Sequence, residues 1–173
     1  LALFVTITIF GPVSGGHLNP AVTLAFWLRR DVSLFVALGF VLAQVLGAVL
    51  GAALAHVMFD LPALQVATKV RNLPSLWLSE VIATAGLILV ILGGLAAKGP
   101  IPALVGAYIT AGYWFTSSMS FANPAMTLAR ILTDSATGLR AADLAAYVIA
   151  QFAGAIVGFA LGHWLFDKEK PPT

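Results

Sequence analysis

Long apolar stretches separated by short polar segments dominate the chain. No Asp, Glu, Lys or Arg occurs within 32–59, 81–97, 99–129 or 144–166. A helix of about 20 apolar residues crosses the hydrocarbon core of a bilayer, and each of these intervals is long enough, or nearly so. The pattern therefore predicts an all-α membrane protein.

The same pattern, read with its Gly, Pro and charged residues, predicts an order of elements. The end of a spanning helix over 1–10 and a turn over 11–18 come first. A helix only half a membrane long follows at 20–29, then a full span at 32–59 and a polar loop at 60–74. Full spans at 75–97 and 101–119 precede a second half-length helix at 124–132 and a loop at 133–140. The last span covers 142–166, and 167–173 form a polar tail.

Composition excludes several other classes of protein. Of the 173 residues, 60% are hydrophobic and only 9% are charged, and the mean hydropathy is +0.98, whereas a soluble domain carries about 25% charged residues. The net charge of +2 without a basic run excludes a nucleic-acid partner. The absence of Cys excludes disulfides and thiolate metal sites. No cofactor, no metal site and no catalytic residue is predicted.

An internal repeat is the most informative feature. Residues 19–25 read Asn-Pro-Ala-Val-Thr-Leu-Ala and residues 123–129 read Asn-Pro-Ala-Met-Thr-Leu-Ala, so six of seven positions agree at an offset of 104. Each copy starts one of the half-length helices, and three full spans are predicted between them. An odd number of spans brings the two short helices in from opposite membrane faces, as an inverted repeat requires.

Small residues recur at matching places in two of the spans. Ala43-Gln44 precedes Gly47, Gly51 and Ala55, and Ala150-Gln151 precedes Gly154, Gly158 and Gly162. Small residues at every fourth position let two helices approach closely. One such stripe indicates ordinary helix packing, but its recurrence supports two duplicated halves.

The chemistry of the Asn-Pro-Ala unit suits a pore. Asn is a preferred N-cap, and Pro is favoured at the first helical position because its missing N–H would be unpaired there. Half-helices at membrane depth are tolerated where protein or a water-filled cavity surrounds them. Two of them meeting head to head would place both positive dipole ends near the bilayer centre, together with the amides of Asn19 and Asn123. Such a point repels cations and accepts neutral hydroxylated molecules.

These motifs resemble the aquaporin (major intrinsic protein) family. The segment Ser-Gly-Gly-His-Leu-Asn-Pro-Ala-Val-Thr at 14–23 is similar to its first pore loop, and Phe-Ala-Asn-Pro-Ala at 121–125 is similar to the second. The resemblance implies six spanning helices and two half-helices in a homotetramer with one pore per subunit. Five spans are visible here, so it also implies that the first helix and the start of the second are missing. The chain is then a single, partial transmembrane domain, with the end of the first repeat in 1–59 and the second repeat in 75–166.

The resemblance also assigns roles to residues. It implies a central constriction made by Asn19, Pro20, Ala21, Asn123, Pro124 and Ala125. It implies pore-lining backbone at Gly15, Gly16, His17, Phe121 and Ala122. It implies an outer selectivity filter that includes Ala111, Ser120 and Met126, with a fourth position twenty residues before Asn19. Met126 stands where the family usually has Arg, which suggests a wider and less polar filter. Glycerol, urea, ammonia and undissociated arsenous acid then become candidate solutes beside water.

Two charged residues have competing interpretations. Arg130 lies one turn after Met126 on the same helix face. It either supplies a displaced positive charge at the outer mouth or is a helix-end Arg that reaches loop carbonyls and headgroups. Glu80 is an ionisable residue in a membrane helix, which is by default a functional candidate; the resemblance implies a structural anchor for the backbone of a pore loop.

Three functional classes remain to be compared. A passive channel for water or small uncharged solutes fits the repeat, and the resemblance favours it. A secondary transporter also uses inverted repeats and broken helices, but no buried carboxylate pair is evident. An intramembrane enzyme would need a nucleophile or a His cluster at ligand spacing. We expect an integral, multi-pass protein of the cell (inner) membrane whose partners are lipid, its permeant solutes and copies of itself.

Overall fold

A computed structural model describes residues 1–166, which consist of helices joined by turns and loops. The polar tail predicted at 167–173 lies outside the described residues. In chain order the helices are α1 (Ala2–Ser14), α2 (Pro20–Leu28), α3 (Leu34–Met58), α4 (Pro74–Ala96), α5 (Ile101–Phe115), α6 (Pro124–Arg130), the 3₁₀ helix η1 (Ala141–Asp143) and α7 (Leu144–Phe166). The all-α prediction is confirmed.

Three helices are long and apolar enough to cross a membrane: α3, α4 and the segment Ala141–Phe166. The full span predicted at 101–119 is wrong in its extent, because α5 has only 15 residues and ends at Phe115. A helix of this length rises about 22 Å, less than the hydrocarbon thickness of about 30 Å. The helix stops because Thr116 takes an extended backbone conformation, with φ −106° and ψ 139°. The residues after it form the second pore loop instead.

The turn predicted at 11–18 begins later than expected. Helix α1 continues through Gly11 and Pro12 to Ser14, and Gly15 ends it with a left-handed φ of 80°. Pro12 lies in the last turn of this helix and cannot donate a backbone hydrogen bond there. Gly is the usual residue at a left-handed helix end because it has no Cβ to clash.

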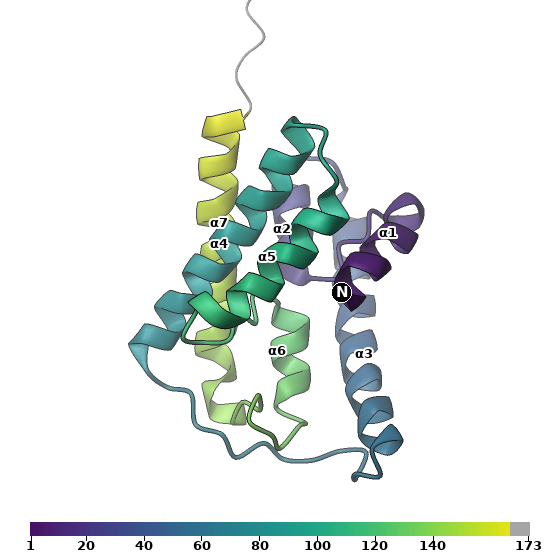
Figure 1. Ribbon diagram of the computed structural model, residues 1–173, viewed down its shortest axis with the longest axis vertical. Helices are drawn as coiled ribbons and strands as arrows, with labels where there is room; N and C mark the ends of the chain where they lie inside the picture. Colours follow the sequence, from purple (N-terminus) through teal and green to yellow (C-terminus); the bar gives the residue numbers. More distant parts are fainter. Residues whose placement is uncertain (167–173) are drawn as a thin grey trace, which may run out of the picture.

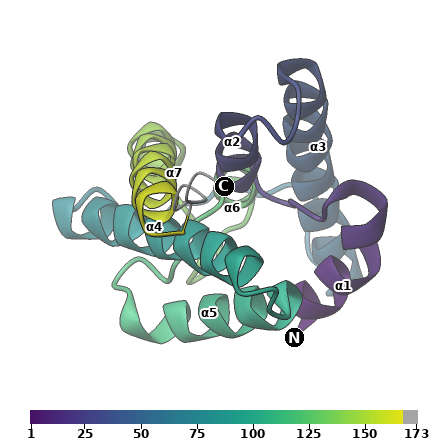
Figure 2. The same ribbon diagram turned by 90° about the horizontal axis from the view of Figure 1, so that it is seen from above.

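The half-helices α2 and α6 occupy the middle of the molecule. Figures 1 and 2 show them stacked one above the other along the long axis, between α7 on one side and α3 on the other. Both pack against α3 and α7. Their first residues face each other at mid-height, which is where the site described below is built.

Within residues 1–166, helices α4 and α7 pack against each other more extensively than any other two helices. A Cβ added to Gly158 would lie 2.5 Å from the Ala85 carbonyl oxygen, and one added to Gly154 would lie 2.5 Å from that of Val81. Glycine is therefore required at this crossing, as the small-residue stripe predicted. The matching stripe on α3 is open, because Gly47 and Gly51 have nothing within 4 Å of an added Cβ.

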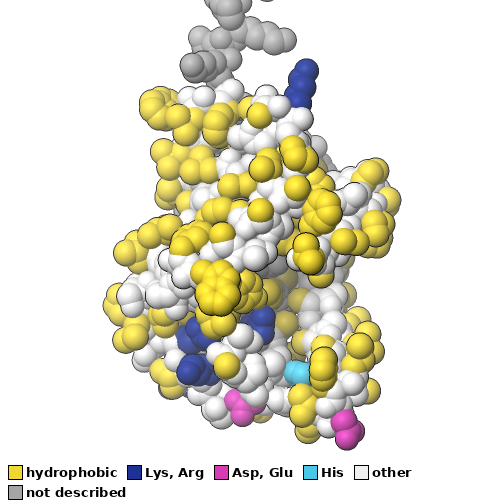
Figure 3. Space-filling model, viewed as in Figure 1, with side chains coloured by type: hydrophobic (Ala, Val, Ile, Leu, Met, Phe, Trp, Pro, Cys, Tyr) yellow, Lys and Arg dark blue, Asp and Glu magenta, His cyan; other side chains and the backbone are white. Residues whose placement is uncertain are grey.

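The outer surface of the molecule is apolar, as contact with lipid requires. Figure 3 shows hydrophobic side chains spread over one face, with the charged side chains gathered mainly near its lower end. Helix α3 contributes a row of exposed leucines at every fourth position: Leu38, Leu42, Leu46, Leu50 and Leu54. The protein is an integral membrane protein.

Candidate functional site

Asn19 starts α2 and reaches across to the other pore loop. Its side-chain oxygen accepts a hydrogen bond of 2.9 Å from the Ala21 N–H, with Pro20 in the first turn. Its amide nitrogen donates to the carbonyl of Ala122 at 2.7 Å. One side chain thus caps its own helix and ties down the opposite loop.

Asn123 makes the reciprocal arrangement at the start of α6. Its side-chain oxygen accepts from the N–H groups of Ala125 at 3.0 Å and Met126 at 3.2 Å. Its amide nitrogen donates to the Leu18 carbonyl at 3.0 Å. An amide nitrogen carries two N–H groups, and each of these uses one across the loops. The second remains available to a solute at the point where both helix dipoles are positive.

The backbone of both pore loops is held in unusual conformations. The left-handed φ values are 61° at Gly16 and 51° at Leu18 in the first loop. In the second loop they are 70° at Met119, 49° at Ser120 and 46° at Ala122. Side chains other than Gly rarely adopt such φ angles, and residues that do so cluster at functional sites. The conformations bring the Leu18 and Ala122 carbonyls to the paired Asn amides.

Glu80 supports the second loop from behind. Its fully buried carboxylate accepts from the N–H groups of Phe121 at 2.9 Å and Ala122 at 2.8 Å. It also accepts from the Gln151 amide at 2.7 Å, and Gln151 donates further to the Thr127 hydroxyl at 2.7 Å. This geometry supports an anchoring role for Glu80. Gln151 was part of a predicted packing pattern, and its polar role in the site was missed.

The first loop has a related polar support. The Gln44 amide donates to the Thr23 hydroxyl at 2.9 Å, and Thr23 lies 3.2 Å from the His17 Nδ1. The His17 ring stacks on Phe26 with a centroid distance of 4.4 Å. His17 thereby fixes the loop from its inner side. The described residues hold no group of three His, Cys, Asp or Glu that could bind a metal.

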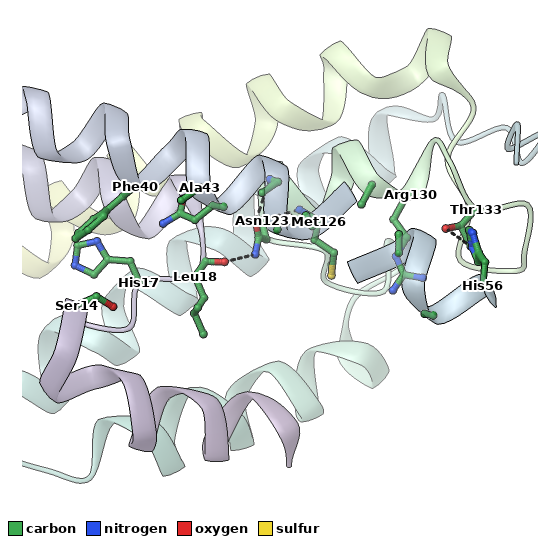
Figure 4. A pocket seen from close by; sticks show the side chains of 17 residues that line it. Ser14, His17, Leu18, Phe40, Ala43, His56, Asn123, Met126, Arg130 and Thr133 are labelled. Carbon is green, nitrogen blue, oxygen red and sulfur yellow. Dashed lines mark hydrogen bonds between the residues drawn. The ribbon is translucent and has the colours of Figure 1, made fainter. Parts of the chain in front are cut away.

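Two cavities meet at the paired asparagines. The larger, of about 740 Å³, lies between α3 and α6 and is shown in Figure 4; we call it the α3–α6 cavity. The smaller, of about 270 Å³, is bounded by α1, α2, α4, α5 and both pore loops; we call it the α4–α5 cavity. Four residues border both: His17, Leu18, Asn123 and Met126.

The other predicted pore residues fall into four groups. Those that border the α4–α5 cavity are Gly15, Gly16, Asn19, Ser120 and Phe121. Those that border the α3–α6 cavity are Ala125 and Arg130. Those that are buried but border neither cavity are Pro20, Ala21, Ala122 and Pro124. Ala111 is exposed on α5 and borders neither cavity.

Met126 and Arg130 project from the same face of α6 into the α3–α6 cavity, as Figure 4 shows. Arg130 donates to the Thr137 hydroxyl, and its guanidinium carbon lies 5.6 Å from the centroid of the Phe121 ring. The Phe121 ring also contacts a second cation, because the guanidinium carbon of Arg71 lies 5.2 Å from the ring centroid. An aromatic face attracts cations, so one ring of the second pore loop orients two positive charges.

Arg71 is a site residue that sequence reasoning missed. It is buried, and its guanidinium donates to the carbonyls of Gly138 and Ala136, both at 2.9 Å. Its backbone N–H donates to the Asp143 carboxylate at 2.8 Å. These bonds fasten the loop after α3 to the loop after α6. No motif or spacing marks Arg71 in the sequence, where it resembles any charge in a polar loop.

Apolar membrane-length helices around two opposed half-helices, with paired amides where two cavities meet, define a membrane channel. The chain belongs to the major intrinsic protein family. The model of that family, described as major intrinsic protein, matches residues 1–112.

Individual relatives agree with this assignment. The chain is 49% identical to the aquaglyceroporin AqpS of Rhizobium meliloti over 170 residues, which are 98% of this chain and 73% of that protein. It is 31% identical to the probable aquaporin AqpM of Archaeoglobus fulgidus, over 96% of this chain and 72% of that protein. It is also 31% identical to a probable TIP-type aquaporin of Medicago truncatula, covering 73% of this chain and 54% of that protein. These relatives favour a passive channel for water or small solutes over a secondary transporter.

Proposed function

We propose that this protein passes neutral hydroxylated solutes larger than water, glycerol first among them, in addition to water. The observation that carries the proposal is Met126, which borders both cavities directly after the second Asn-Pro-Ala unit. Met is a flexible apolar side chain, so it leaves room that a fixed charge would not. The relative named an aquaglyceroporin supports the same class of solute.

Cations are repelled by the charges around this path. Both half-helices present their positive ends at the asparagine pair, and the Asn amides offer donors there. Arg130 adds a positive charge on the α3–α6 side, and we propose that it takes the part of a filter cation displaced by one helical turn. The guanidinium carbon of Arg71 lies 5.2 Å from the centroid of the same Phe121 ring, but Arg71 borders neither cavity. A cation would meet repulsion at the asparagine pair and at Arg130, whereas a neutral solute would not.

The central test is flux through the full-length protein reconstituted in proteoliposomes. Stopped-flow light scattering should show water and glycerol entering faster than in empty liposomes, with no saturation at high glycerol. Arsenous acid and urea extend the series, and a sodium gradient tests ion exclusion. Passage of water alone would overturn the proposal. A saturable flux with a steep temperature dependence would favour a transporter.

Three coarser features complete the proposal. Segments 1–59 and 75–166 act as the two halves of one pore domain, joined by the crossed Asn bonds. The subunits assemble as a homotetramer, as the resemblance to the family implies. The protein resides in the cell (inner) membrane. Native mass spectrometry and membrane fractionation test the last two features.

A further inference from the structure

We propose that the thioether of Met126 is a modification site, at which a small neutral peroxide that enters the pore forms methionine sulfoxide and lowers the permeability. The inference rests on the proposed function in one respect, because the oxidant follows the path of a neutral hydroxylated solute. It goes beyond that function because it gives the sulfur atom of Met126 a chemistry of its own, whereas the permeation of solutes uses this side chain only as an apolar wall.

The position of Met126 presents its sulfur to molecules inside the pore. Met126 lies in the first turn of α6 and, like Asn123, borders both cavities. Its side chain is half-buried rather than enclosed by protein. Figure 4 shows the sulfur pointing away from α6 into the α3–α6 cavity. A solute that passes the asparagine pair therefore meets this sulfur.

The chain has two other methionines, and each lies in a different setting. Met58 is the last residue of α3 and is 73% exposed. Met119 is half-buried in the second pore loop, where its sulfur lies 3.5 Å from a guanidinium nitrogen of Arg71. A sulfur lone pair that faces a donor is less available to an oxidant. Met58 and Met119 thus provide an exposed and a shielded reference for Met126.

Oxidation of a thioether by hydrogen peroxide needs no other reactant. A lone pair of the sulfur attacks one peroxide oxygen, the O–O bond breaks and an S–O bond forms. The proton of the attacked oxygen moves to the departing oxygen, which leaves as water. The sulfur loses two electrons and the peroxide gains them. The product is methionine sulfoxide, which is polar where methionine is apolar.

The new oxygen would compete with solutes for the Asn123 amide. Asn123 donates one N–H to the Leu18 carbonyl and has a second N–H for a solute. Its side-chain oxygen accepts from the Met126 backbone N–H at 3.2 Å, so both side chains leave the first turn of α6 close together. A sulfoxide oxygen is a much stronger acceptor than a thioether sulfur. The modified side chain would take the free N–H and add bulk where the two cavities meet.

The first test treats the full-length protein in proteoliposomes with hydrogen peroxide. Peptide mass spectrometry should find one added oxygen on Met126. We expect glycerol and water flux to fall about three- to tenfold from their untreated values, as the loss of one hydrogen bond to the solute would give. Met126→Leu has no sulfur at this position, so its flux should not respond to peroxide, whatever its starting value. Met58→Leu and Met119→Leu should respond as the parent does.

The second test compares oxidants of different size. Hydrogen peroxide is small enough to follow a polyol through the pore, whereas tert-butyl hydroperoxide carries a bulky apolar group. Both should oxidise the exposed Met58. Only hydrogen peroxide should oxidise Met126 appreciably, because its sulfur is reached through the pore.

Three results would overturn the proposal. Met126 could stay unmodified at peroxide concentrations that oxidise Met58, it could react equally with both oxidants, or the peroxide-induced loss of flux could persist in Met126→Leu. The proposed function fails separately, when the untreated parent passes water alone. In that case, size-dependent oxidation of Met126 with a loss of water flux still supports the modification site, and the lack of either refutes it.

Discussion

The carboxylate of Glu80 lies 2.7 Å from the amide nitrogen of Gln151, at the crossing of α4 and α7. The same carboxylate accepts from two backbone N–H groups of the second pore loop, those of Phe121 and Ala122. Three donors therefore converge on one fully buried acid. The tight helix pair of the second half and the pore loop are joined at this point, so support of the loop depends on the pairing of the helices.

Replacing Glu80 with Gln should destabilise the protein although the two side chains have the same shape. The Gln amide has one accepting oxygen, and its NH₂ group would face a donor that the carboxylate now satisfies. We expect a loss of about 2 kcal/mol or more, seen as a melting temperature lowered by about 5 °C in detergent. Asp60→Asn, at the exposed end of α3, is the control and should change little. Equal melting temperatures for both variants would refute the anchoring role.

Replacing the paired asparagines with Ala or with Asp should change the permeability of the pore in different ways. Asn19→Ala removes a helix cap worth about 1 kcal/mol together with the bond to Ala122. Asn19→Asp keeps an accepting oxygen for the cap but loses the donor and places a negative charge beside the solute path. We expect both to reduce glycerol and water flux, and only the Asp variant to leak sodium. The corresponding variants of Asn123 should behave in the same way. Wild-type flux in both Ala variants, at normal expression, would rule out the central site.

Met126→Arg should narrow the solute range. The new guanidinium would enter the region shared by both cavities, where a charge and its donors act in a low dielectric. We expect glycerol flux to fall more than water flux, by about tenfold in their ratio, which corresponds to about 1.4 kcal/mol. Met126→Leu keeps the volume and the apolar character and should preserve the ratio. If Met126→Arg leaves the ratio unchanged, Arg130 or another residue must limit the pore.

Arg130→Gln tests the displaced filter charge. The amide keeps hydrogen-bonding capacity toward Thr137 but removes the positive charge that lies over the Phe121 ring. We expect sodium or proton leakage to rise in liposome assays while glycerol flux is kept. Lys98→Gln, at the exposed turn between α4 and α5, removes the same charge far from the asparagine pair and is the control. Identical ion leakage in both variants would show that Arg130 is a structural helix-end residue.

Part of this site could be predicted from the sequence because it depends on local rules. Asn followed by Pro at 19–20 and at 123–124 predicts a cap and a first turn whatever surrounds them, and the structure has both helices starting there. Long apolar intervals likewise predict membrane helices. The hydrogen bonds that join the two loops have a sequence separation of more than 100 residues, and only the repeat indicated that they could form.

Other parts could not be predicted because they depend on where a helix stops and turns. Whether Ala111 borders a cavity depends on the end of α5 at Phe115 and on the eight residues that follow before α6. The α5 residues that border the α4–α5 cavity are Ile101, Val105, Ile109 and Tyr113, at intervals of four. Arg71 had no signal in the sequence, since its partners are backbone carbonyls of a distant loop.

The open stripe on α3 has a consequence for biogenesis. An 18-residue stretch of α3 has a mean hydropathy of 2.3, yet only 6% of this stretch is buried. In the corresponding stretch of α4, 56% is buried. A segment such as α3 partitions into the bilayer on its own apolarity as it leaves the translocon, without waiting for neighbours. Helix α4 carries buried polar groups whose hydrogen-bond partners lie on α7 and the second loop. The final packing of α4 therefore follows the synthesis of α7 and of the second loop.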